Sequence, residues 1–152
     1  MNTSAQLLGI ARRARPKAFM EPLRQGVLSS EHGLSGDCRG KPGKRQVTVL
    51  NKVQWQQACA AIGRDLEWTT RRANLLVDSI TFGPQDVGRV LAVGKARLQV
   101  SYECDPCHRM DAVAEGLRTA LESDWRGGIC CRVEQGAIIR VGDPVYWLDR
   151  SG

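Results

Sequence analysis

Short apolar segments separated by tight turns run through most of this chain, and they constrain its fold more than any other feature. Apolar or alternating segments of strand length are bounded by glycine, proline or polar turn residues. We predict strands for residues 6–12, 47–50, 75–80, 90–93, 96–103, 129–134, 137–141 and 145–148. Gly94 and Lys95 predict a hairpin between two of them.

Only two segments have the apolar spacing of a helix. Asn51 can cap a helix that reaches Ile62, with either Val53, Gln57 and Ala61 or Ala58 and Ile62 on one face, and Gly63 ends it. Residues 111–121 predict the second helix. Many short strands with few helices indicate a mainly β (α+β) fold, which we expect to be one β-barrel of about seven strands with two or three peripheral helices.

Length and apolar content set further limits. With 152 residues, we expect one domain over 1–152. No apolar run reaches the roughly 18 residues that span a bilayer, so we predict no membrane partner. The first twenty residues have no apolar stretch typical of a secretory signal, and their basic residues are better explained by a first strand than by a transit peptide. We therefore expect a cytoplasmic protein with reduced thiols.

The positive charge comes mainly from arginine. The formal net charge is +6, and arginine supplies 17 of the 22 basic residues. A guanidinium group binds phosphate or carboxylate through two parallel hydrogen bonds, although a solvated surface accounts equally well for most of these residues. Aromatic residues make up only 5% of the chain and no long basic run occurs, so nucleic acid is not a predicted partner.

The segment YECDPCHRM, residues 102–110, contains the most reactive side chains. It places Cys104, Cys107 and His108 where a predicted strand gives way to a loop, which suits a nucleophile or a soft-metal ligand. Covalent haem would need export, and a redox dithiol would need a helix start within a βαβ unit. Neither context is indicated.

Zinc is a stronger alternative. Cys104 and Cys107 have ligand spacing, and His108 or one residue of the Cys130–Cys131 pair could complete the site. Adjacent cysteines on a strand point to opposite faces, so at most one of that pair would join. We expect Cys59, Cys130 and Cys131 to be small buried apolar residues. The remaining alternative is a single thiolate, Cys107, that ligates a metal cofactor.

Seven segments in a fixed order give the sequence a family resemblance. They are GLSGD (33–37), GKRQVTVL (43–50), RRANLLV (71–77), VGKARLQV (93–100), CDPCHRM (104–110), WRGGICCRV (125–133) and VGDPV (141–145). In this order they resemble the MOSC domain, named for the C-terminal part of molybdenum cofactor sulfurase, in its small bacterial form.

The resemblance implies a compact β-barrel that binds the molybdenum cofactor, molybdopterin. The family's cysteine falls on Cys107, which would be both the metal ligand and the catalytic residue, with Cys104 as a reserve thiol. The cofactor-binding positions fall on Gly33, Gly36, Asp37, Arg72, Asn74 and Arg126. We expect these residues and Cys107 to line one cleft.

Two functions are compatible with the resemblance. The first is a small reductase of N-hydroxylated compounds that receives electrons from a separate electron-transfer protein. The second is a carrier, without turnover of its own, that passes the cofactor or persulfide sulfur to an acceptor molybdoenzyme.

Overall fold

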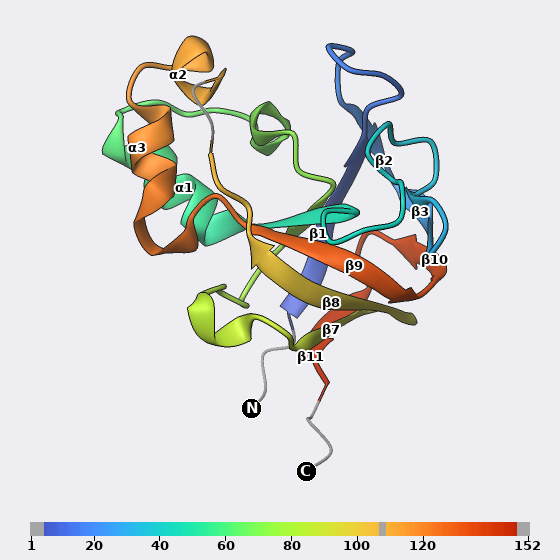
Figure 1. Cartoon of the computed structure of the whole chain (residues 1–152). Coiled ribbons are helices and arrows are strands. Elements are labelled where there is room, and N and C mark those ends of the chain that lie inside the picture. The colour runs from blue at the N-terminus through green and yellow to red at the C-terminus, as the bar shows by residue number, and fades with distance from the viewer. Residues whose placement is uncertain (1–4, 107–108, 149–152) are drawn as a thin grey trace.

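A closed β-barrel forms the centre of the molecule (Figure 1). The structure, a computed structural model, describes residues 5–106 and 109–148. The barrel strands are β1 (Ala5–Arg12), β5 (Val47–Asn51), β6 (Leu75–Val77), β7 (Val90–Val93), β8 (Ala96–Glu103), β9 (Ile129–Gln135) and β11 (Pro144–Trp147). Their hydrogen-bonded order is β11-β7-β8-β9-β5-β6-β1, and pairing of β11 with β1 closes the ring. Only β5 and β6 are parallel among these pairs, so the barrel is mixed.

The remaining elements lie on two sides of the barrel. The strand β2 (Glu21–Leu23) pairs with β1 in antiparallel orientation. A second sheet contains β3 (Gln25–Ser29), β4 (Gly33–Leu34) and β10 (Ala137–Arg140). The helices α1 (Lys52–Ala61), α2 (Arg109–Val113) and α3 (Leu117–Glu122) lie together on the side away from β2, β3 and β10 (Figure 1). Seven barrel strands and three α-helices in the described residues confirm the predicted barrel.

Two apolar clusters correspond to these two parts. The first fills the barrel and includes Leu28 and Ile139 from the second sheet, which therefore closes part of the barrel core. The second joins Trp55 of α1 and Leu117 of α3 to Leu50 on the barrel wall. Their burial removes apolar surface from water, which is the main favourable contribution to folding.

The helix α1 follows the prediction closely. The Asn51 side chain accepts a hydrogen bond from Gln54 N at 2.8 Å, so it caps the helix as expected. After the C-cap at Ile62, Gly63 adopts a φ of +65°, which ends the helix. The buried face includes Ala58, whereas the face beginning at Val53 is exposed, so the first of the two predicted faces was wrong.

Two predicted elements are shorter than expected. The predicted helix over 111–121 is split between α2 and α3 because Gly116 has a φ of +84°, which a right-handed helix does not contain. The predicted strand over 75–80 stops at Val77. Beyond it, Ser79 has a φ of +58° and Ile80 N donates to Asp78 O, so the backbone turns. No helix within residues 5–106 and 109–148 has the length and apolar character needed to cross a bilayer.

Candidate functional site

The thiol of Cys104 lies just beyond the last residue of β8. Cys104 N donates to Gly128 O at 2.9 Å, so the backbone remains attached to the start of β9 after the strand has ended. The residue is only 5% exposed. This loop cysteine is thus buried and hydrogen-bonded at the wall of the barrel.

The guanidinium of Arg71 fixes this cysteine from the other side. Its Nη2 lies 2.7 Å from Cys104 O and 3.4 Å from Cys104 Sγ, and its Nε donates to Gly127 O at 3.2 Å. A Cβ at Gly127 would lie 2.7 Å from Cys104 O and 3.1 Å from Arg71 Nη2, so glycine is required there for the close approach. Arg71 is itself buried, and its charge acts in a poorly solvated environment.

Cys130 is the second neighbour of Cys104. It lies opposite Tyr102 in the β8–β9 register, while Cys131 belongs to the apolar core of the barrel. The adjacent cysteines therefore point to opposite faces, as predicted, and Cys59, Cys130 and Cys131 are all buried.

The surroundings of Cys104 lower the pKa of its thiol. A hydrogen bond from Cys130 has the largest effect on its pKa and lowers it, while burial acts in the opposite direction. The positive charges of Arg71, Arg45 and Arg39 lower it further, and the result is a pKa of about 6 in place of the ordinary 9.0. The pKa of Cys130 is raised, first by its hydrogen bond to Cys104 and then by burial. Cys130 therefore retains the shared proton.

A cavity of about 120 Å³ opens beside Cys104, and its lining is strongly positive. Asp105 is the one acidic residue among the described residues that line it. The five arginines that line it are Arg39, Arg45, Arg71, Arg72 and Arg109. Such a surface favours an anion with several charged oxygens.

Arg72 and Asn74, two predicted cofactor-binding residues, have different surroundings in the structure. Arg72 lines the cavity and has a φ of +66° and a ψ of +30°, a left-handed conformation that is uncommon for arginine. Asn74 is buried and bonds to backbone groups: Oδ1 accepts from Thr48 N at 3.1 Å, and Nδ2 donates to Ala11 O at 3.2 Å. It joins β5 to β1 and lines a second, smaller cavity that Arg72 also lines.

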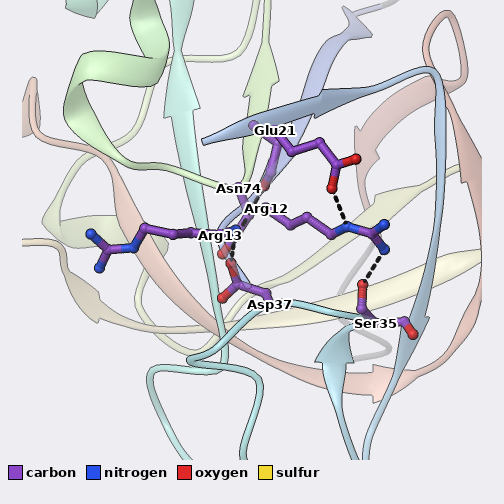
Figure 2. Close-up of polar contacts among 7 residues, drawn as sticks. Arg12, Arg13, Glu21, Ser35, Asp37 and Asn74 are labelled. Carbon is purple, nitrogen blue, oxygen red and sulfur yellow. Dashed lines mark hydrogen bonds and ion pairs between the residues drawn. The ribbon is translucent and has the colours of Figure 1, made fainter. Parts of the chain in front are cut away.

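In the predicted glycine-rich loop, Asp37 reaches the second cavity. Its Oδ1 accepts from Arg13 N at 2.9 Å, which ties the loop to the residue directly after β1 (Figure 2). Its Oδ2 accepts from Arg39 N at 3.1 Å within the loop. Gly33 and Gly36 line neither cavity. A Cβ at Gly36 would lie 2.7 Å from Arg12 Nη1, and one at Gly33 would lie 2.9 Å from Gln46 O. In this structure both glycines make room for neighbouring groups.

Arg126 is not brought to either cavity. Its Nη1 donates to Ala120 O at 3.4 Å, and its Nη2 lies 3.9 Å from Asp124 Oδ2. The next residue, Gly127, lines the larger cavity. The RGG segment thus contributes backbone to the site.

Cys107 and His108 lie outside the described residues. Asp105, two positions before Cys107, and Arg109, directly after His108, both line the larger cavity. Within the part of the chain that the structure describes, no group of three or more His, Cys, Asp or Glu side chains could hold a metal ion. The zinc alternative depends on Cys107 and stays untested.

Arg71 and Arg13 were not among the predicted site residues. Arg71 and Arg72 stand in the same basic turn before β6, and the family resemblance assigns the cofactor-binding arginine to Arg72. Arg13 directly follows the last residue of β1, and in the sequence it is one of several basic residues near the N-terminus. Burial is the property that separates them from surface arginines, since both are less than one tenth exposed.

Comparison with known proteins places this fold and sequence in a family. The sequence model of the MOSC domain matches residues 30–146. No curated protein matches the chain significantly.

Several crystal structures share the fold. The YuaD protein from Bacillus subtilis has a TM-score of 0.75 and 16% identity, over 94% of this chain and 94% of that one. YiiM from Geobacillus stearothermophilus has a TM-score of 0.75 and 19% identity, over 96% of this chain and 76% of that one. YiiM from Escherichia coli has a TM-score of 0.73 and 15% identity, over 97% and 71% respectively.

At such low identities the structural likeness establishes the fold alone, whereas the sequence match covers most of the chain and spans the cavity. The chain therefore belongs to the MOSC domain family, which is associated with binding of the molybdenum cofactor.

Proposed function

We propose that the arginine-lined cavity binds the molybdenum cofactor, with Cys107 as the metal ligand, and that the protein is a small molybdenum-dependent reductase of N-hydroxylated compounds. One observation carries this proposal. The segment that contains Cys107 begins at a thiol held by Arg71, beside a cavity lined by five arginines.

The residues present suit this cofactor by charge and by donor chemistry. A soft or high-valent metal favours thiolate ligands, and the segment from 104 to 107 contains two cysteines. A phosphate group favours guanidinium donors. Within the described residues, Arg39, Arg45 and Arg109 form no salt bridge that would neutralise them. Their charge is therefore available to an anion.

When bound, the cofactor would supply a metal centre that removes one oxygen atom from the substrate with two electrons from a separate donor. The chain's own residues would prepare the site. Arg71 fixes the backbone of the cysteine segment through Cys104 O. Reduction of an N-hydroxyl group to an amine and water also consumes two protons. These protons would come from solvent, and Asp105 is the exposed acidic residue of the cavity lining.

The test uses protein produced in a host that makes molybdopterin. We expect about one molybdenum atom per chain by elemental analysis, and loss of the metal in Cys107→Ala without loss of the fold. Cys59→Ala is the matched control, because Cys59 is buried in the helical cluster and should leave the metal content unchanged. Molybdenum retained in Cys107→Ala would remove Cys107 from the ligand role, and one zinc per chain would favour a structural zinc site instead.

Turnover is tested on the loaded protein with a chemical electron donor and a hydroxylamine or an amidoxime. Formation of the amine or amidine over many turnovers supports the reductase. The alternative, a cofactor or sulfur carrier, is favoured by the Cys104 thiolate, a second nucleophile beside the cavity. That thiolate would attack the outer sulfur of a protein persulfide, and the donor thiolate would leave. Transfer of cofactor or sulfur to an apo-molybdoenzyme without turnover would refute the reductase.

A further inference from the structure

The thiols of Cys104 and Cys130 form a pair on one face of the β8–β9 ladder. Tyr102 lies opposite Cys130, and Cys104 N donates to Gly128 O, so the register continues past the end of β8. Residues two positions apart point to the same face of a ladder, which makes the two cysteines diagonal neighbours. A hydrogen bond joins their side chains. A disulfide therefore requires only that two sulfur atoms already in contact approach each other.

The two thiols differ in their access to the larger cavity. Cys104 lines this cavity, whereas Cys130 is fully buried and is not among the described residues that line it. The volume of about 120 Å³ is enough for several water molecules, so a reagent of similar size can reach Cys104. Such a reagent would meet Cys104 first, and Cys130 could react only with a product formed on Cys104.

Arg71 makes Cys104 the better nucleophile of the pair. Its Nη2 lies 3.4 Å from Cys104 Sγ, and its charge is buried. A neighbouring cation favours the thiolate, which is the form that attacks. The same cation would stabilise negative charge that develops on an oxygen leaving beside the sulfur. The hydrogen bond between the cysteines lowers the pKa of Cys104 and raises that of Cys130, in agreement with this division of roles.

We propose that Cys104 and Cys130 form a peroxide-reactive dithiol, in which hydrogen peroxide oxidises Cys104 and Cys130 then closes a disulfide with it. In the first step the Cys104 thiolate attacks one peroxide oxygen. An S–O bond forms, the O–O bond breaks, and the leaving hydroxide takes a proton from solvent to become water. In the second step the Cys130 thiol attacks Cys104 Sγ. The S–S bond forms, the S–O bond breaks, and the Cys130 proton leaves with the hydroxide as water.

The electrons and the consequence for the site follow from these two steps. The two sulfur atoms together lose two electrons, which reduce the peroxide to two water molecules. Formation of the disulfide removes the nucleophilic sulfur of Cys104 from the cavity wall, and a thiol reductant restores it. This inference goes beyond the proposed function and is independent of it, because neither step uses Cys107 or a bound cofactor.

The experiment treats the full chain with hydrogen peroxide at neutral pH and maps its cysteines by mass spectrometry. Trypsin cleaves after arginine, so Cys104 lies in the peptide 98–109 and Cys130 in the peptide 127–132. We expect a crosslink between these two peptides, assigned to Cys104 and Cys130 by fragmentation. The crosslink should disappear after reduction with dithiothreitol.

Cys130→Ala and Cys131→Ala are matched variants, since the two residues are adjacent and both are fully buried. Cys130→Ala should form no crosslink and should keep a sulfenic acid on Cys104 that dimedone labels, whereas Cys131→Ala should behave as the wild type. Cys38 is the internal control for access. It is more exposed than Cys104, yet we expect Cys104 to be oxidised at least about tenfold faster.

Four results would overturn the dithiol. They are no crosslink in the wild type, a disulfide between Cys104 and Cys107, a crosslink through Cys131, or oxidation of Cys38 before Cys104. If Cys130→Ala does not fold, the crosslink assigned in the wild type still decides. Molybdenum is measured on the same samples. A Cys104–Cys130 disulfide in protein that acquires no molybdenum would refute the proposed function and leave the dithiol standing.

Discussion

Replacing Arg71 by methionine should raise the pKa of Cys104, so that more of its thiolate is protonated at neutral pH. With a pKa of about 6, Cys104 is about 90% ionised at pH 7, compared with about 1% at the ordinary value of 9.0. Arg71 lies 3.4 Å from the sulfur, and a hydrogen bond to a charged group contributes roughly 1.5–3 kcal/mol. Since about 1.4 kcal/mol corresponds to one pKa unit, the pKa should rise by about 1–2 units in Arg71→Met.

The measurement is a titration of the ultraviolet absorbance of the thiolate, taken as the difference between each protein and the same protein carrying Cys104→Ser. Lys52→Met is a suitable control, since Lys52 is an exposed cation on α1 and does not line the cavity. Cys130→Ala should also raise the pKa, because it removes the hydrogen bond with the largest lowering effect. An unchanged midpoint in both Arg71→Met and Cys130→Ala would refute this account of the thiolate.

The same pKa makes stability depend on pH. The folded pKa is depressed, so ionised Cys104 stabilises the fold above the unfolded pKa near 9.0, and this contribution is lost as the pH falls through about 6. Cys130 stays protonated when folded and contributes little in this window. The free energy of unfolding should fall by roughly 2 kcal/mol more in the wild type than in Cys104→Ser between pH 8 and pH 6. Parallel pH profiles in urea unfolding would contradict the assignment.

Three further predictions concern the frame of the site. Asn51→Ala should lower the free energy of unfolding by about 1 kcal/mol or more, because it removes the cap of α1 and a hydrogen bond to Ile80 O. Gly36→Ala should destabilise more than Gly63→Ala in urea unfolding: both have positive φ, but only Gly36 has a neighbour within 4 Å, Arg12. Equal losses would remove the steric argument. Gly127→Ala should push Arg71 from Cys104 O and raise the thiol pKa; an unchanged titration would show that the contact is not required.

Local signals predicted the parts of the fold that depend on neighbours in sequence. The hairpin of β7 and β8 has the predicted limits because Gly94 adopts the left-handed conformation that a tight turn needs. The cap at Asn51 is a contact across three residues. By contrast, β2 and β3 were missed because they are short and contain Pro22 and Gly26, both unfavourable within a strand. These two segments form strands because they pair with β1 and β10, which are distant in sequence or not adjacent to them.

The sequence predicted only part of the site, because some of its contacts join residues that are far apart in sequence. The cysteine segment and Arg72 could be found because unusual residues cluster in sequence. The contact of Arg71 with Cys104 spans 33 positions, and nothing in either segment indicates which of two adjacent arginines turns inward. Arg71 ends a short turn, whereas Arg72 has a left-handed backbone, and the two adjacent side chains differ in burial.

Buried polar side chains explain how so short a chain keeps its cavity in place. Asn74 bonds to backbone groups of β5 and β1, and Gln46 bonds to Ser30 O, Gly40 O and Val133 N. Arg71 does the same for the carbonyls of Cys104 and Gly127. Each side chain bonds to backbone groups of separate segments and so holds those segments together. In this structure, therefore, the asparagine of the R-x-N segment is a positioning residue: it joins β5 to β1 beside Arg13, which follows β1, and Arg72, which precedes β6.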